Sequence, residues 1–150
     1  AIQDYPELQL ATWELERPGP TYTLDTLHFL RAEVYPLPTP LTIIMGADTF
    51  LQLPTWHDWS HLIQLAHFLV IYRETSLAFP LVLRELLIKH ETRDPSELLQ
   101  QSHGRIYCTH AGDYPIASRN IRQTIQQGDS PAEYLPPKVW EYIQKNGLYR

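Results

Sequence analysis

Three short apolar runs, separated by segments of helical character, constrain the fold of this 150-residue chain most strongly. They occupy residues 41–45, 67–73 and 105–109. The first run contains β-branched Ile43 and Ile44 between Pro40 and Gly46, which favours a strand that is buried on both faces. Strands that alternate with helices indicate βαβ units. The sequence therefore predicts an α/β fold in a single domain, residues 1–150, with a parallel sheet flanked by helices.

Turn and capping residues divide the remaining segments. Thr21 or Thr23 can cap a helix that ends near Tyr35, before the prolines at 36, 38 and 40. Ser118 can cap a helix at 119–127. Further helices are expected after Asp58, at 81–90, at 95–101 and from 137 to 147. Residues 8–16 instead show a strand-like alternation.

Composition and charge narrow the class of protein. The chain is 43% apolar and 19% charged, as globular proteins are, and its net charge of −5 argues against a general nucleic-acid binder. Cys108 is the only cysteine, so we expect no internal disulfide and a cytoplasmic location. No apolar run approaches the roughly 20 residues of a membrane span, so we expect no membrane association. Because the chain begins with Ala1 rather than Met, we expect an N-terminal truncation.

Gly46, Asp48 and Trp56 follow the first apolar run and form the first group of candidate site residues. Open α/β sheets bind ligands beyond the carboxyl ends of their strands, where Asp48 is expected. Gly46 has no Cβ, so a flat ligand can approach it closely. Asp48 can accept a hydrogen bond from a ribose or an ammonium group, or it can simply cap a helix. Trp56 can stack on a flat heterocycle or fill the core. The group suggests a nucleotide-like ligand.

Two further segments add candidate residues for the same ligand. Tyr22 and Thr23 lie at a helix start, where Thr23 and the backbone N–H groups can bind a carboxylate or merely cap the helix. Arg73 is expected at the carboxyl end of the second strand. Its guanidinium can stack on an adenine, contact phosphate or remain solvated.

A phosphate site is one interpretation of the segment that follows the third strand. Ser118, Arg119 and Arg122 combine a hydroxyl with two guanidiniums at a helix start, although a solvated helix face explains them equally well. The seven histidines lack the spacing of metal ligands, so we expect no protein-bound metal. Cys108 is expected to be a buried, unreactive side chain.

Several of these segments resemble the nicotinate-nucleotide adenylyltransferase family of bacterial NAD synthesis. The resemblance is carried by residues 17–27 around Tyr22-Thr23, by Gly46-Ala-Asp48, by Pro54-Thr-Trp56, by 66–73 and by the ending at 135–150. It covers most of the chain and implies a Rossmann-like nucleotidyltransferase fold.

The resemblance implies an enzyme that transfers AMP from ATP to nicotinate mononucleotide, giving deamido-NAD and pyrophosphate, with Mg²⁺ on the phosphates. Homo-oligomer formation stays open. The implied contacts are Tyr22, Thr23, Trp56 and the backbone of His57 for nicotinate mononucleotide, Gly46, Asp48, Arg73 and Arg119 for ATP, and Ser118 and Arg122 for the reacting phosphates.

Two departures from the family pattern bear on activity. The family's Gly-x-Phe-x-Pro and His-x-Gly-His motifs do not occur in these 150 residues, and without the strands around them we expect open sheet edges. The family's Ile-Ser-x-Thr-x-x-Arg corresponds to 116–122, with Ala117 at the serine position and Arg119 at the threonine position. We therefore expect little or no turnover. The alternatives are a non-catalytic nucleotide-binding homologue and a sibling such as pantetheine-phosphate adenylyltransferase.

Overall fold

The computed structural model describes residues 2, 5–72, 78–110, 112 and 116–150. They fall into two compact units. The larger unit is Thr12–Asp113, and the smaller unit combines Ala1–Ala11 with Tyr114–Arg150. The prediction of one domain over residues 1–150 stays a prediction.

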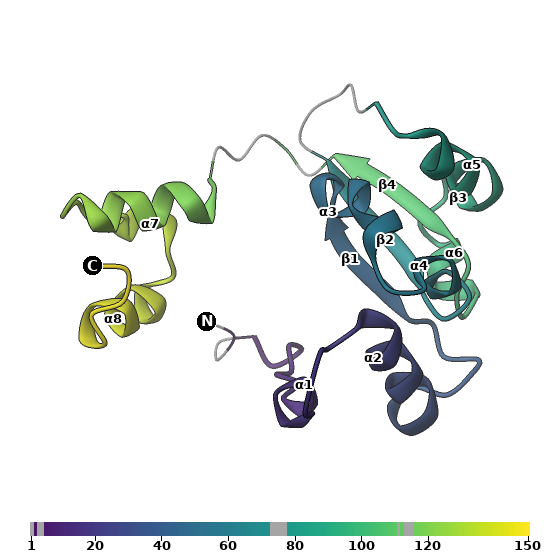
Figure 1. Ribbon diagram of the computed structural model, residues 1–150, viewed down its shortest axis with the longest axis horizontal. Helices are drawn as coiled ribbons and strands as arrows, with labels where there is room; N and C mark the ends of the chain where they lie inside the picture. The colour runs from purple at the N-terminus through teal and green to yellow at the C-terminus, as the bar shows by residue number, and fades with distance from the viewer. Residues whose placement is uncertain (1, 3–4, 73–77, 111, 113–115) are drawn as a thin grey trace. The chain divides into compact units, whose positions relative to one another are not determined.

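A four-stranded sheet forms the centre of the larger unit, with the strand order β1-β2-β4-β3 (Figure 1). The strands are β1 (Thr42–Gly46), β2 (His67–Tyr72), β3 (Glu91–Thr92) and β4 (Ile106–His110). All neighbouring pairs are parallel, and Val70 of β2 aligns with Met45 of β1 and with Cys108 of β4. The predicted α/β fold with a parallel sheet is confirmed. The sequence does not predict β3, because two residues are too few to carry a pattern.

Helices connect and flank these strands. The larger unit contains α1 (Trp13–Glu16), α2 (Thr23–Phe29) with its π-helical extension η1 (Leu30–Val34), α3 (Ala47–Leu51), η2 (Leu53–Thr55), α4 (Trp59–Leu62), α5 (Leu81–His90) and α6 (Glu97–Gln100). The smaller unit contains α7 (Ser118–Gln126), η3 (Ala132–Tyr134) and α8 (Pro137–Lys145). Within the part of the chain that the structure describes, no helix has the length and apolar character needed to cross a bilayer.

The prediction of a strand at residues 8–16 is wrong. Residues 13–16 form the short helix α1, and the residues before it form no strand. Leu10 and Leu15 are 79% and 86% exposed, so the alternating pattern buries no apolar face. An alternation favours a strand only where one face of that strand has a surface to cover.

Two of the predicted helix caps are also wrong. The N-cap residue of α2 is Tyr22 rather than Thr21 or Thr23, and the N-cap residue of α7 is Ala117 rather than Ser118. Neither helix start has a side-chain cap hydrogen bond. Thr23 and Ser118 are instead the first helical residues, so their own backbone N–H groups need no intrahelical partner.

The first strand is covered on one face only, contrary to the prediction that both faces are buried. Met45 is buried, whereas its neighbour Ile44 is 67% exposed. β1 is an edge strand of the sheet, so one of its sides has no strand partner among the described residues. That missing strands leave this edge open stays a prediction. Which face of a strand is covered depends on what packs on the sheet in the folded chain, and the local sequence does not encode that.

Aromatic side chains hold α3 against the sheet. Phe50 of α3 and Phe68 of β2 are both fully buried, and their rings meet edge to face at 6.4 Å between centroids. Phe79 adds a second edge-to-face contact with Phe50 at 5.6 Å. Such contacts add to the hydrophobic stabilisation that burial provides. They fix the position of the segment that directly follows β1.

A partly buried arginine, Arg31, connects several loops in the larger unit. The Arg31 guanidinium donates five hydrogen bonds, at 2.6–3.0 Å, to four backbone carbonyls. Two come from Nε and Nη2 to Leu65, and the others reach Ser102, Tyr35 and Thr39. Burial lowers the pKa of Arg31 from its ordinary value. The side chain therefore serves as a charged hydrogen-bond hub.

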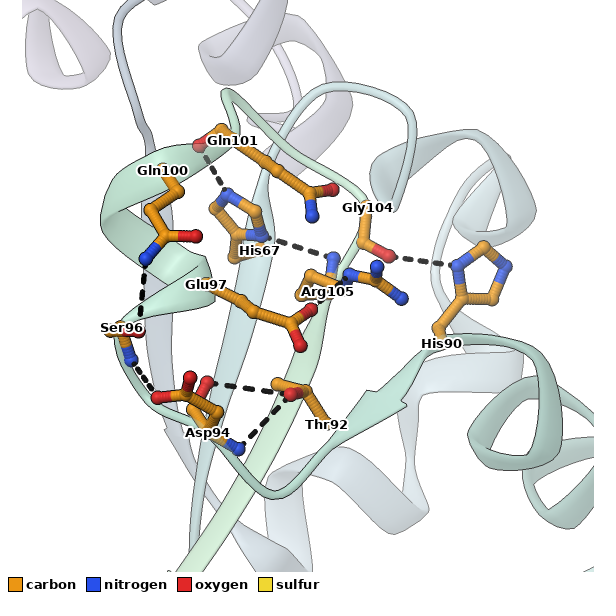
Figure 2. Close-up of polar contacts among 10 residues, drawn as sticks. All are labelled: His67, His90, Thr92, Asp94, Ser96, Glu97, Gln100, Gln101, Gly104 and Arg105. Atoms are coloured by element: carbon orange, nitrogen blue, oxygen red, sulfur yellow. Dashed lines mark hydrogen bonds and ion pairs between the residues drawn. The ribbon is translucent and has the colours of Figure 1, made fainter.

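His67 provides a second anchor at the start of β2 (Figure 2). Its fully buried ring accepts a hydrogen bond at Nδ1 from the Arg105 backbone N–H, at 3.0 Å, and Nε2 donates to the Gln101 carbonyl, at 2.8 Å. This pattern requires the neutral Nε2–H tautomer. Burial lowers the pKa of His67, and the nearby His103, Arg31 and Arg105 lower it further, against an opposing contribution from the Gln101 bond.

Two contacts complete this network. The Glu97 carboxylate lies 2.7 Å from Nε of Arg105, and the pair interacts as opposite charges rather than through a well-aligned hydrogen bond. His90 Nδ1 lies 2.9 Å from the Gly104 carbonyl (Figure 2). The loop between α6 and β4 is therefore held by side chains from several elements.

Candidate functional site

The carboxyl end of β1 presents a glycine and an exposed carboxylate. Gly46 is exposed, and a Cβ added to it would meet no atom within 4 Å. Asp48 lies in the first turn of α3, is exposed, and makes no side-chain hydrogen bond to any described residue. The alternative that Asp48 merely caps α3 is therefore unsupported, because the N-cap residue is Gly46. The space and the carboxylate remain available to a ligand.

The burial of Trp56 fits both roles considered for it, packing in the core and stacking on a flat ligand. It follows η2 directly, and its backbone N–H donates to the Leu53 carbonyl at 3.0 Å. Its indole is partly buried and packs against the core, with part of the ring still accessible. The side chain can therefore contribute to packing and also offer a face to a flat ligand.

Two of the predicted substrate-binding residues are in direct contact. The ring of Tyr22, just before α2, lies 4.5 Å from the ring of His57 between centroids, with 31° between the ring planes. Both side chains are exposed. Thr23 and Trp56 are their chain neighbours, so the structure brings all four predicted residues onto two adjoining segments. Nothing in the spacing of the sequence predicts the contact between the two rings.

A cavity of about 290 Å³ lies beside these segments, between α2 and α4. Leu24, His28, Asp58, His61, Gln64 and Leu65 line it. His61 Nδ1 is 3.9 Å from an Asp58 carboxylate oxygen, an exposed pair that contributes little to stability. Among the residues that the structure describes, no group of three or more His, Cys, Asp or Glu side chains is placed to hold a metal ion.

The predicted phosphate-binding residues belong to the smaller unit. Ser118, Arg119 and Arg122 lie in the first turns of α7 and are exposed. The Arg122 guanidinium carbon is 6.0 Å from the centroid of the Tyr149 ring, which is a cation–π contact within that unit. These three residues therefore share the smaller unit, and the other described candidate residues belong to the larger unit.

No protein-family model matches the chain. Curated proteins do match it along all of its length. The probable nicotinate-nucleotide adenylyltransferase of Legionella pneumophila (strain Corby) is 37% identical over 152 residues, which cover all of this chain and 71% of the relative. The protein of the same name from Pectobacterium atrosepticum is 39% identical over 153 residues, with the same coverage. The chain belongs to the nicotinate-nucleotide adenylyltransferase family. A third member, from Acidithiobacillus ferrooxidans, is 34% identical over 152 residues.

Membership of the adenylyltransferase family confirms the resemblance and, with the parallel sheet, the Rossmann-like fold. The chain spans about 70% of the length of these relatives. In the segment 116–122, Ala117 is the N-cap residue of α7 and Arg119 is exposed on its first turn. Ala117 offers no side-chain oxygen at the helix start, whereas Ser118, the first helical residue, carries a hydroxyl.

Two residues singled out in the sequence, Arg73 and Cys108, remain to be placed. Arg73 lies outside the described residues. Cys108 is partly buried in β4, and burial, with a smaller contribution from Glu91, raises the pKa of its thiol to about 11. A thiol with this pKa remains protonated at neutral pH, so Cys108 is a poor nucleophile.

Proposed function

We propose that this chain acts in the transfer of AMP from ATP to nicotinate mononucleotide, which gives deamido-NAD and pyrophosphate. The observation that carries the proposal is the 34–39% identity, along all of the chain, to relatives named for this activity. The geometry adds that Tyr22 and His57 are in contact and that Gly46 and Asp48 are accessible.

The substrate-binding roles follow from the chemistry of each side chain. The accessible part of the Trp56 indole would stack on the nicotinate ring. Thr23 and the backbone N–H of His57 would donate to its carboxylate, with Tyr22 beside them. Gly46 and Asp48 would hold the adenosine, and Arg73 would contact the adenine. These contacts orient the two substrates, and orientation supplies a large part of the catalysis in phosphoryl-transfer reactions.

In the reaction, a phosphate oxygen of nicotinate mononucleotide bonds to the α-phosphorus of ATP. The bond from that phosphorus to the bridging oxygen breaks, and pyrophosphate leaves. Ser118, Arg119 and Arg122 would bind the triphosphate oxygens as hydrogen-bond donors and positive charges. Mg²⁺ held mainly by phosphate oxygens and water would neutralise charge on the triphosphate. Low turnover of this chain stays a prediction.

Calorimetric titration with each substrate, together with an assay for deamido-NAD, tests the proposal. Trp56→Ala should weaken the binding of nicotinate mononucleotide about 5- to 150-fold, because base stacking contributes about 1–3 kcal/mol. The affinity of the Trp56→Ala variant for ATP should not change. The matched control is Trp140→Ala in α8 of the smaller unit, which should leave nicotinate mononucleotide binding intact.

The outcomes separate the alternatives. Binding of both substrates without deamido-NAD formation would indicate a non-catalytic nucleotide-binding homologue. Turnover with phosphopantetheine, and none with nicotinate mononucleotide, would indicate a sibling enzyme. Failure to bind either substrate would refute the proposal.

A further inference from the structure

The chain turns back sharply at the end of α8 through a Schellman motif. The Leu148 N–H donates to the Ile143 carbonyl, at 3.1 Å, and the Gly147 N–H donates to the Gln144 carbonyl, at 3.2 Å. These two bonds, with Gly147 in the left-handed region at φ 59°, are the pattern that defines this motif. The residues that follow α8 are therefore fixed to its last turn.

Tyr149, directly after this motif, has an unusual backbone conformation. Its φ is 66°, in the left-handed region that aromatic residues seldom adopt, and residues other than glycine that are held there cluster at functional sites. The Tyr149 ring lies against Arg122, with 6.0 Å between the guanidinium carbon and the ring centroid, which is within the range of cation–π contacts. The strained residue after α8 thus brings an aromatic ring to a charged side chain of α7 (Figure 1).

The contact with Tyr149 leaves the hydrogen-bonding groups of Arg122 available. Arg122 is exposed, and its side chain makes no hydrogen bond or ion pair with any residue that the structure describes. An aromatic ring attracts a guanidinium through its quadrupole and does not need the N–H donors. A carboxylate in the same place would occupy these donors and repel an incoming phosphate. The ring therefore holds the cation and leaves its donors to an anionic ligand.

The surroundings of Arg122 on α7 favour such a ligand. Ser118 and Arg119 lie four and three residues before Arg122, so both are its neighbours on the helix surface. The two guanidiniums repel each other at this spacing, and a bound anion relieves that repulsion. A long exposed side chain also loses rotamer freedom when a ligand immobilises it, and a side chain already held by a ring loses less. The contact with Tyr149 therefore prepares Arg122 to bind an anion.

We propose that Tyr149 is a positioning residue for the triphosphate of ATP and acts through Arg122. The inference rests on the proposed function, in which Arg122 binds the triphosphate, and deepens it. The phenol ring holds the guanidinium in place, and the guanidinium N–H groups donate to phosphate oxygens. Tyr149 itself contacts no substrate in this role.

Calorimetric titration of the chain with ATP and with AMP tests this role. Tyr149→Leu removes the ring and keeps an apolar side chain. It should weaken ATP binding about two- to fivefold, as expected for the loss of an exposed cation–π contact. AMP binding should change less, because AMP carries one phosphate instead of three. Tyr149→Phe keeps the ring face and should restore the wild-type affinity for ATP. In an Arg122→Met background, Tyr149→Leu should have no further effect.

Tyr142→Leu is the matched control, because Tyr142 is an exposed tyrosine of α8 that makes no cation–π contact with a described arginine. It should bind ATP as the wild type does. Wild-type ATP affinity in Tyr149→Leu, or an equal loss with and without Arg122, would overturn the inference while leaving the proposed function standing. Equal losses for ATP and AMP would indicate a general structural effect and would also overturn it. Failure of the wild-type chain to bind ATP would overturn the proposed function and this inference together.

Discussion

Replacement of His67 by glutamine should remove an acid-dependent loss of stability. The folded protein holds His67 neutral, because its Nδ1 accepts from the Arg105 N–H and its ring is fully buried. The pKa of the folded residue is lowered from the ordinary 6.5, which the unfolded chain retains. Above about pH 6.5 the full stability is present. Below it, the unfolded state binds a proton that the folded state does not, so the free energy of unfolding falls until the folded pKa is reached.

The magnitude follows from proton linkage. Below about pH 6.5, the free energy of unfolding falls by about 1.4 kcal/mol for each pH unit over which the folded ring stays neutral while the unfolded ring is protonated. His67→Gln abolishes this pH-dependent contribution to the free energy of unfolding. Its amide N–H can still donate to the Gln101 carbonyl, but the Arg105 N–H loses its acceptor. The variant should therefore be less stable by about 1–3 kcal/mol at every pH in this range.

Urea unfolding followed by circular dichroism, repeated at several pH values, measures both effects. His28→Gln is the control, because His28 is exposed on α2 and should preserve the pH dependence of the wild type. The reasoning is refuted if His67→Gln loses as much stability as the wild type on acidification. It is also refuted if the wild type loses none in this range.

Three further results are expected. Arg31→Met should lower the free energy of unfolding by about 1–3 kcal/mol in urea titrations, because it leaves partly buried carbonyls such as that of Leu65 without their charged donor; a loss below about 0.5 kcal/mol would contradict this. Phe68→Ala should cost about 3–5 kcal/mol in the same assay, whereas Tyr142→Ala, 63% exposed, should stay within about 0.5 kcal/mol. Asp94 accepts from the Ser96 N–H, which lowers the pKa of its carboxyl. Its contribution is present above about pH 4 and is lost as pH falls through the lowered value, so Asp94→Asn should flatten the stability profile only below about pH 4.

The periodicity of the sequence predicts the main elements because it reports local burial. The apolar runs that become β1, β2 and β4 are in the right places, and the helices after Thr23, Pro80 and Pro136 also form. The same reasoning fails for Ile44, because the covering of each sheet face depends on tertiary packing. It fails at the two caps as well, because a hydroxyl next to a helix start can face the solvent instead of the backbone.

The candidate site could be predicted in part. Motif resemblance selects Tyr22 and His57, yet nothing in either segment shows that their rings touch, because such a contact depends on tertiary packing. The role of His67 is also hidden, since in the sequence it looks like the first residue of an apolar strand. Its two hydrogen-bond partners, Gln101 and Arg105, come from a loop much later in the chain.

The lone thiol on β4 gives this protein a built-in probe of sheet opening. Because Cys108 is partly buried and burial raises the pKa of its thiol to about 11, an alkylating reagent should modify it slowly in the native state and faster when β4 separates from its neighbours or the chain unfolds. The labelling rate measured by mass spectrometry would therefore report how often the sheet opens locally, without any engineered tag. A ligand that binds only the closed sheet should slow the reaction by the factor 1 + [L]/Kd.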